Sequence, residues 1–232
     1  EERGAVRAGV LATLVDVYCG GLALEIAEPN WLATLDLSLH LCRPLSRGHV
    51  VARGSVLRAG RQTIVLEVAL ADDAGTEAGM ATMTYAILPR RADTPVHARD
   101  FSAPRTELGG PGSGLAAPFA DSLGIRVVDA AAGRAEIEMS DYVRNSLSAL
   151  QGGAAATLVD VASVAFGREL LGTPVATTDL EIHYLALGKL APIHSRARLL
   201  RRDDRSASLR VEVRESGADA RLCYVATTRV GG

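Results

Sequence analysis

The sequence predicts an α+β fold made of two copies of one unit, each an antiparallel sheet wrapped around a central helix. Three observations carry this prediction: an internal repeat, an apolar helical pattern early in each copy, and strand-like alternation after it. The hexapeptide Ala-Thr-Leu-Val-Asp-Val at residues 12–17 recurs unchanged at residues 156–161. Residues 33–40 are matched in the same order, at nearly the same separation, by residues 176–183. Two matches in register indicate a duplicated unit.

The first copy starts with a helix that we expect at residues 10–24. Apolar residues surround this segment on most sides, as expected for a helix that a sheet covers. The leucines at 35, 37, 39 and 41 then alternate with polar residues, which indicates a half-buried strand. Three more strands are expected at 50–57, 63–70 and 77–87, with a hairpin turn at Asp72-Asp73-Ala74-Gly75.

The second copy repeats this order, with a helix at 154–171 and strands at 194–200, 206–214 and 221–230. A turn is expected at Ser216-Gly217. This copy also has a leading segment, residues 115–150, with strands expected at 124–128 and 134–139. The first copy has no visible counterpart, and the chain opens with Glu-Glu rather than Met. We therefore expect that part of the first unit is missing at the N-terminus.

The expected domain boundaries follow from a change of composition in the middle of the chain. Residues 89–114 carry four prolines and end in a glycine-rich run at 109–114, which indicates a linker. We expect a first domain at 1–90, a linker at 91–114 and a second domain at 115–232. The glycine run follows no clear strand and opens no helix, so it is not a nucleotide-binding loop.

Composition narrows the class of protein. Hydrophobic residues make up 48% of the chain and charged residues 22%, as in soluble globular proteins. The formal charge of −2 provides no basic field for nucleic acid. Three distant cysteines without CxxC spacing argue against a disulfide framework or a zinc site and favour a cytoplasmic setting. No apolar run approaches the ~18–20 residues of a membrane span, and no signal peptide opens the chain.

Two aspartates stand out because each lies in the middle of an apolar helix. Burying an unpaired carboxylate costs several kcal/mol, so Asp16 and Asp160 must be held by strong partners or kept for function. Gly152 and Gly153 precede the second of them at the expected helix start. Amide N–H groups at a helix N-terminus carry partial positive charge and stabilise a developing oxyanion. Tight helix–sheet packing is the alternative role for this glycine pair.

The segment from Asn145 to Asp160 carries a resemblance to a known family. Its Asn145, Gln151-Gly152-Gly153 and Thr157-Leu158-Val159-Asp160 resemble the hotdog thioesterases of the phenylacetate-pathway (PaaI-like) type, whose pattern is Asn, His-Gly-Gly and Thr-Leu-x-Asp. Gln151 stands where that family has His. The resemblance implies two tandem hotdog domains that pair within the chain as a pseudo-dimer. It also implies an acyl-CoA substrate with coenzyme A as part of it, no other cofactor and no metal, and it allows a homodimer of the double unit.

The resemblance further implies sites built across the pair of domains. One site sets Asp16 and Thr34 against Asn145, Gln151 and Gly152, with Gly153 beside them in substrate binding. The reciprocal site sets Asp160 and Thr177 against Arg7, Ala8 and Gly9, where the His-Gly-Gly pattern has decayed. We therefore predict unequal sites, with the Asp16 site the stronger, and with the aspartate acting as general base on water or as nucleophile.

Other candidates have weaker support. Thr34 and Thr177 are also ordinary strand residues. The repeated His40 and His183 lie on a polar strand face, so a solvent-facing or interface position is expected rather than catalysis. The pairs Arg90-Arg91 and Arg201-Arg202 are candidates for binding the phosphates of CoA, although such pairs are commonly only solvated.

The leading function is hydrolysis of an acyl-CoA thioester with a medium or long acyl chain between the two helices. A non-catalytic acyl-CoA-binding protein is an alternative, which the decayed segment at 7–9 favours. A hotdog dehydratase or hydratase is a third. Such enzymes pair a catalytic His with an acid, and neither helix start offers that His.

Overall fold

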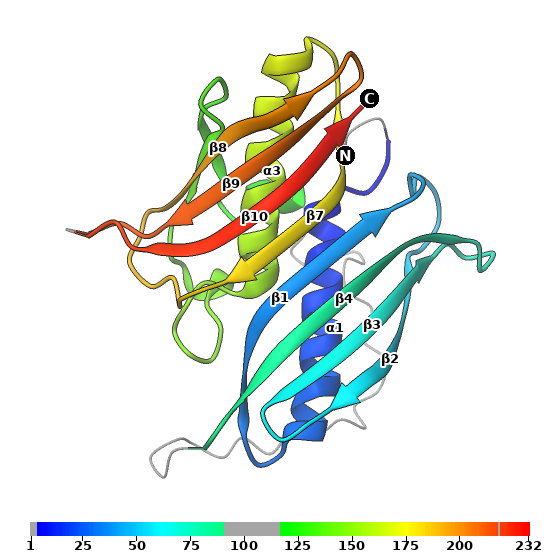
Figure 1. The fold of residues 1–232 in the computed structure, drawn as a ribbon, viewed down its shortest axis with the longest axis vertical. Helices are drawn as coiled ribbons and strands as arrows, with labels where there is room; N and C mark the ends of the chain where they lie inside the picture. Colours follow the sequence, from blue (N-terminus) through cyan, green and yellow to red (C-terminus); the bar gives the residue numbers. More distant parts are fainter. Residues whose placement is uncertain (1–3, 91–116, 218) are drawn as a thin grey trace.

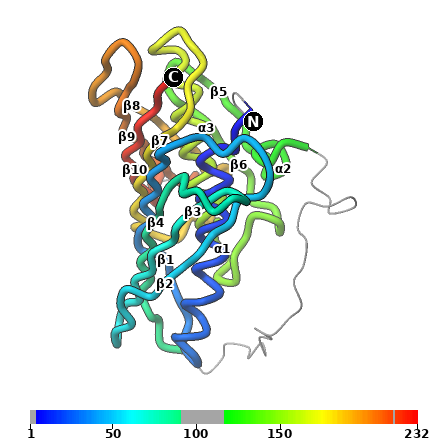
Figure 2. Tube along the Cα trace, turned by 90° about the vertical axis from the view of Figure 1, so that its right-hand side faces the viewer, coloured from blue at the N-terminus to red at the C-terminus, as the bar shows by residue number. Residues whose placement is uncertain are grey.

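A computed structural model describes residues 4–90, 117–217 and 219–232. The expected linker at 91–114, with its glycine run and Arg91, lies outside the described residues. Within them, ten strands form one antiparallel sheet in the order β2-β3-β4-β1-β7-β10-β9-β8-β6-β5 (Figure 1). Two long helices, α1 (Ala8–Ala27) and α3 (Gly152–Leu171), lie on the same side of it (Figure 2). The predicted α+β class is confirmed.

Each repeat contributes one side of this sheet. The first repeat supplies β1 (Trp31–Leu41), β2 (Val51–Ala59), β3 (Thr63–Ala71) and β4 (Glu77–Leu88). The second supplies β5 (Arg126–Asp129), β6 (Arg134–Ile137), β7 (Ala176–Tyr184), β8 (Ile193–Arg202), β9 (Ser206–Arg214) and β10 (Leu222–Gly231), with short helices α2 (Phe119–Ser122) and η1 (Asp141–Val143). The strands match the predicted ranges within a few residues, except that β1 begins earlier than the alternating leucines.

The two halves meet where β1 pairs antiparallel with β7. Asp36 lies opposite His183, and His40 lies opposite Asp179, so the repeated residues of one half face those of the other. His40 Nδ1 lies 3.0 Å from Asp179 Oδ1, and His183 pairs with Asp36 in the same way. Both histidines are about half exposed, which confirms the predicted solvent-facing position. The continuous sheet makes the chain a pseudo-dimer of its own repeats.

The two long helices touch through glycine and threonine. A Cβ on Gly153 would lie 2.6 Å from Thr13 Cα, and one on Gly9 would lie 2.8 Å from Thr157 Cα, so neither position tolerates a side chain without movement. Thr13 Oγ1 and Thr157 Oγ1 lie 3.1 Å apart at the contact. The packing alternative considered for Gly153 is thus realised between two helices and not between helix and sheet.

Helix α1 corrects one expectation. Its 20 residues are long and apolar enough, by length and composition alone, to cross a membrane, whereas no such run was expected. Asp16 divides the segment into two shorter apolar runs, so no unbroken apolar run of this length is present in the sequence. In the fold, α1 packs against α3 and against strands of both halves, as the core helix of a folded domain does.

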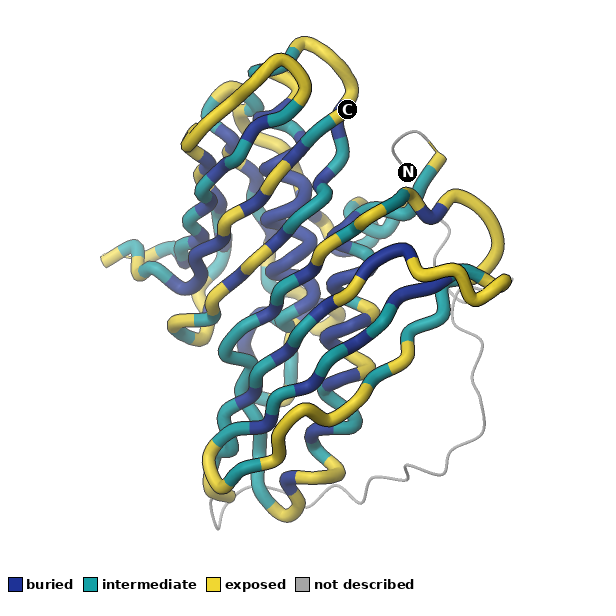
Figure 3. The backbone as a smooth tube through the Cα atoms, turned by 45° about the vertical axis from the view of Figure 1, so that its right-hand side comes forward, coloured by how far each residue is buried: buried dark blue, intermediate teal, exposed yellow. Residues whose placement is uncertain are grey.

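The edge strand β2 is mostly exposed (Figure 3).

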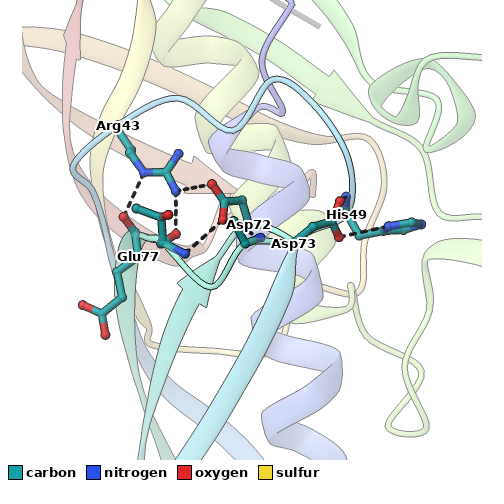
Figure 4. Close-up of polar contacts among 7 residues, drawn as sticks. Arg43, His49, Asp72, Asp73 and Glu77 are labelled. Atoms are coloured by element: carbon teal, nitrogen blue, oxygen red, sulfur yellow. Dashed lines mark hydrogen bonds and ion pairs between the residues drawn. The ribbon is translucent and has the colours of Figure 1, made fainter.

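The predicted turn after β3 is confirmed and is braced from a neighbouring loop. Asp72 Oδ1 accepts hydrogen bonds from the amides of Ala74 and Thr76, both at 3.0 Å, and Gly75 adopts a φ of 79°. Arg43 Nη2 donates to Asp72 Oδ2 at 2.7 Å, and Arg43 Nε donates to the carbonyl oxygen of Glu77 (Figure 4). These bonds fasten the loop after β1 to the turn.

Candidate active site

A cavity of about 480 Å³ lies where the two halves meet beside the N-terminus of α3. This volume is in the range of small-molecule binding sites. Helix α1 forms one wall, β1 and β4 a second, and the segment before α3 with the end of β7 a third. The lining includes five residues predicted for one site: Asp16, Thr34, Asn145, Gln151 and Gly152.

Asp16 is the buried acid of this cavity, with 7% of its surface exposed. Its Oδ2 accepts hydrogen bonds from Gln151 Nε2 at 2.6 Å and from the Gly153 amide at 3.0 Å. Its Oδ1 accepts one from Thr34 Oγ1 at 3.4 Å. All three donors are neutral. Burial therefore dominates and raises the pKa of Asp16 to about 6, although the bonds from Gly153 and Thr34 act in the opposite direction.

Gly152 lines the same cavity. Among the first amides of α3, that of Gly153 binds Asp16, that of Ala154 binds Gln151 Oε1, and that of Ala155 binds the Gln151 carbonyl. The Gly152 N–H has no acceptor among the described residues. A Cβ on Gly152 would lie 2.8 Å from Asp16 Oδ1, so only glycine lets the carboxylate approach this helix start. The cavity thus holds a basic carboxylate and an open N–H donor side by side.

Asn145 and Tyr184 hold the third wall in place. Asn145 Oδ1 accepts the amides of Leu147 at 2.9 Å and Ala149 at 3.1 Å, which folds the segment before α3 into a tight turn. Tyr184 Oη donates to the Gly152 carbonyl oxygen at 2.9 Å. Burial, with Asp16 nearby, raises the pKa of the Tyr184 hydroxyl well above its usual value, so this group stays a neutral donor.

The reciprocal position is built differently. Asp160 is 1% exposed, and its Oδ2 lies 3.0 Å from Arg7 Nε. Arg7 occupies the place before α1 that Gln151 occupies before α3, so a guanidinium replaces a neutral amide. Thr177 lies in the wall of a smaller cavity of about 310 Å³ with Arg7 and Asp160. Among the described residues, Asp160 Oδ1 and Thr177 Oγ1 are buried without a hydrogen-bond partner.

Four predicted residues line neither the Asp16 cavity nor the Asp160 cavity. Gly153 and Gly9 are used in the contact between α1 and α3, and Gly153 also donates its amide to Asp16 rather than to a ligand. Arg90 follows β4 and Arg201 lies on β8, and both are exposed and line neither the Asp16 nor the Asp160 cavity. The expected contacts of these arginines with a phosphate therefore have no support from the position of either cavity.

The sequence did not indicate the three tyrosines that line the cavity: Tyr85, Tyr184 and Tyr224. Tyr85 lies opposite Thr34 in the pairing of β1 with β4 and donates to the Asp16 carbonyl oxygen at 3.3 Å. Tyr184 and Tyr224 pack edge to face with ring centroids 5.3 Å apart. A tyrosine at a strand end is ordinary, so only its position directly after the repeated segment at 176–183 could have marked Tyr184.

Comparison with known proteins identifies the class. The family model of the thioesterase superfamily matches residues 4–79 and 148–219, one segment in each repeat. The chain belongs to the thioesterase superfamily. A candidate esterase of Halobacterium salinarum is 39% identical over 77 residues, which are 32% of this chain and 50% of the relative. A second, from Saccharolobus solfataricus, is 27% identical over 37% of this chain and 61% of the relative. The matches thus span about half to three fifths of these relatives.

Solved structures share the whole architecture. An acyl-ACP thioesterase from Bacteroides thetaiotaomicron has a TM-score of 0.64 at 14% identity, covering 99% of this chain and 92% of that one. A protein with the hotdog fold from Alicyclobacillus acidocaldarius has a TM-score of 0.57 at 17% identity, covering 98% of this chain and 87% of that one. At such identities the likeness concerns the fold. The fold is a tandem hotdog, as predicted; membership of the PaaI-like subfamily stays a resemblance.

Proposed function

We propose that the chain hydrolyses acyl thioesters of coenzyme A at the Asp16 cavity. Membership of the thioesterase superfamily supports thioester hydrolysis as the reaction. One observation carries the choice of site: a buried carboxylate whose partners are all neutral lies beside the open amide of Gly152, and the two come from different halves. A base and an oxyanion donor at one cavity are the two groups that acyl transfer to water requires.

The reaction follows from these two groups. Asp16 accepts a proton from a water molecule as the water oxygen attacks the carbonyl carbon of the thioester. The carbonyl oxygen becomes an oxyanion, which accepts the Gly152 N–H and is stabilised by the partial positive charge at the start of α3. Collapse of this intermediate breaks the carbon–sulfur bond, and the departing thiolate takes the proton that Asp16 accepted, which gives CoA and a free acid and restores the carboxylate. Direct attack by the Asp16 carboxylate, with later hydrolysis of the anhydride, is the alternative.

Gln151 makes two hydrogen bonds through its side chain, although it stands where the family that this segment resembles has His. Its Nε2 donates to Asp16 while its Oε1 accepts the Ala154 amide, so one side chain orients the carboxylate and caps α3. Because the amide is neutral, it orients the Asp16 carboxylate without compensating its negative charge. We assign Gln151 and Thr34 to positioning of Asp16, and Asn145 to positioning of the wall that carries Gly152.

The raised pKa of Asp16 predicts the pH dependence of turnover. The base is active when ionised, so kcat/KM rises with pH through the folded-state pKa of about 6 and levels off above it. Below that value, kcat/KM falls about tenfold per pH unit, because one proton inactivates the base. A pH profile of kcat/KM between pH 4.5 and 8.5 checks this. A midpoint near the ordinary value for aspartate would contradict the proposed role.

The test of the reaction is release of free thiol from a panel of acyl-CoAs, with acyl-ACP as a second carrier. Asp16→Asn keeps the size of the side chain and removes the base, so kcat should fall by about 10²- to 10⁴-fold. Asp160→Asn is the matched control in the other half, and it should retain most of the turnover. Tight binding without thiol release from either carrier would overturn hydrolysis and favour a binding protein. Hydration of an enoyl-CoA without thiol release would identify a hydratase.

A further inference from the structure

The Asp16 cavity continues along α1 past two adjacent glycines. Val17, Gly20, Gly21 and Leu24 recur at spacings of three and four residues, so they share one face of the helix, and all four line the cavity. From Asp16 to Leu24 the helix rises about 12 Å. The cavity therefore follows α1 for roughly this length, starting at the buried carboxylate.

Packing does not account for these glycines. Glycine inside a helix is less favourable than alanine, so two in a row need a reason. The common reason is close approach of another segment, as at Gly9 and Gly153 in this protein. A Cβ on Gly21, however, would have no heavy atom within 4 Å, and one on Gly20 would meet only the Tyr85 hydroxyl at 3.8 Å. What the two glycines preserve is the empty space beside them.

The opposite wall is also made of small side chains. Ala33 of β1 and Ala86 of β4 are paired across the strands, and both line the cavity. We call the part of the cavity lined by Gly20, Gly21, Ala33 and Ala86 the glycine bay. Further apolar side chains also line the cavity: Leu24, Trp31, Leu32 and Leu88.

In the described part of the second repeat, side chains stand where α1 has its two glycines. The residues of α3 equivalent to Gly20 and Gly21 are Val164 and Ala165, and Val164 lines the smaller cavity at Asp160. A valine and an alanine in that position show that the repeated helix accepts side chains there. The open space beside α1 is therefore a property of one half and not a requirement of the fold.

We propose that Gly20 and Gly21 set the acyl-chain specificity, with the acyl chain of the thioester lying along α1 in the glycine bay. This inference rests on the proposed function, because it takes the thioester carbon to lie between Asp16 and Gly152. An apolar space that continues about 12 Å from the carboxylate suits a linear aliphatic chain that reaches past Gly21. The substrates are then medium- or long-chain acyl thioesters, and a short acyl group leaves the bay unfilled.

The test fills the bay and follows chain-length preference. In Gly21→Leu, the added side chain projects into the bay, so the ratio of kcat/KM for dodecanoyl-CoA to that for butanoyl-CoA should fall at least about tenfold. Gly21→Ala should lower the same ratio less. Ala165→Leu is the matched control, because it adds bulk at the equivalent position of α3, which lines neither cavity, and it should leave the ratio at the wild-type value.

The outcomes separate this inference from the proposed function. If the wild-type protein releases thiol and Gly21→Leu leaves the ratio of kcat/KM for the two chain lengths unchanged, the role of the glycine bay is wrong. The proposed hydrolysis is then unaffected. An equal loss for both chain lengths in a folded Gly21→Leu protein also overturns the role of the glycine bay, because only a general defect would then be present. If wild-type protein releases thiol from no acyl-CoA, the proposed function fails first. Binding of a non-hydrolysable dodecanoyl thioether of CoA, weakened by Gly21→Leu and not by Ala165→Leu, supports the bay independently of turnover.

Discussion

Asp16 and Asp160 occupy the same position in two copies of one helix, but the partners of Asp16 are neutral and the partner of Asp160 is a cation. Asp16 is held by three neutral donors, and burial raises its pKa to about 6. Asp160 lies 3.0 Å from the guanidinium of Arg7. A buried carboxylate with a cationic partner is electrostatically compensated, whereas one without it holds its proton more readily. One copy therefore holds a buried acid with neutral partners and a raised pKa, and the other holds a buried ion pair.

The difference extends along the two helices. Leu14 and Val17 of α1 are 37% and 58% exposed, whereas their equivalents in α3, Leu158 and Val161, are 0% and 8% exposed. Among the described residues, β5 and β6 also pack against α3, and no corresponding pair of strands packs against α1. The more open helix also has the larger cavity, about 480 Å³ against about 310 Å³.

Removing the compensated acid should have the largest effect on stability. Asp160→Ala takes the carboxylate away from the partly buried Arg7 guanidinium, and breaking such a pair costs about 3–5 kcal/mol of unfolding free energy. Urea unfolding at pH 7.5, followed by circular dichroism, measures this loss. Turnover per folded molecule should stay close to wild type, because the Asp16 cavity is left intact.

Asp16→Ala is the matched control for this effect. It removes a carboxylate whose burial is itself unfavourable above pH 6, so its loss of unfolding free energy should be clearly smaller than that of Asp160→Ala. The sign follows from the raised pKa: the contribution of Asp16 to stability is fully present below its unfolded value of 3.8 and is lost as the pH rises through about 6. Equal losses in the two variants at pH 7.5 would contradict the contrast between the sites.

The repeat made most of the architecture predictable from the sequence. The two identical hexapeptides and the alternating leucines were enough to predict both long helices and most strands along the chain, because these follow from periodicity. The resemblance supplied the pairing of the copies. The position of β1 beside β4 rather than β2 was not predicted. Burial of Asp16 and Asp160 was predictable too, since each lies in an apolar helix. The resemblance placed Asn145, Gln151 and Gly152 opposite Asp16, and the structure brings those residues together at one cavity.

The finer contacts were not predictable, because they depend on positions across the pseudo-dimer. Nothing in the sequence assigns the Gly153 amide to Asp16 rather than to a ligand, or the Tyr184 hydroxyl to the Gly152 carbonyl. Glycine is equally ambiguous by itself. Gly153 and Gly21 both lie within apolar helices, yet one is required by a neighbouring backbone and the other by empty space.

Substitution by alanine should destabilise the protein at Gly153 and stabilise it at Gly21. In Gly153→Ala, the new Cβ meets Thr13 Cα at 2.6 Å, so the helices must separate, at a cost of about 1–3 kcal/mol for overpacking. In Gly21→Ala, the Cβ meets nothing, and the better helix propensity should stabilise the protein by about 0.5–1 kcal/mol. Thermal unfolding of the two variants measures both. Destabilisation by Gly21→Ala would show that the glycine bay is not empty.

Replacing the neutral partner of Asp16 by a cationic one gives the most specific change. Gln151→Arg copies the Arg7 arrangement into the Asp16 cavity. A guanidinium favours the ionised carboxylate, so the pKa of Asp16 should fall and the midpoint of the kcat/KM profile should move below pH 6. A less basic carboxylate is a weaker base, and turnover on the plateau should drop about tenfold.

Gln151→Ala separates the charge from the lost hydrogen bonds. It also removes the cap of α3 and the 2.6 Å bond to Asp16, but it brings no cation, so the midpoint should move upward as the carboxylate loses a donor. Opposite shifts in the two variants would attribute the difference between the sites to the single residue before each helix. A shift in the same direction would mean that loss of the amide, and not the sign of the neighbouring charge, controls Asp16.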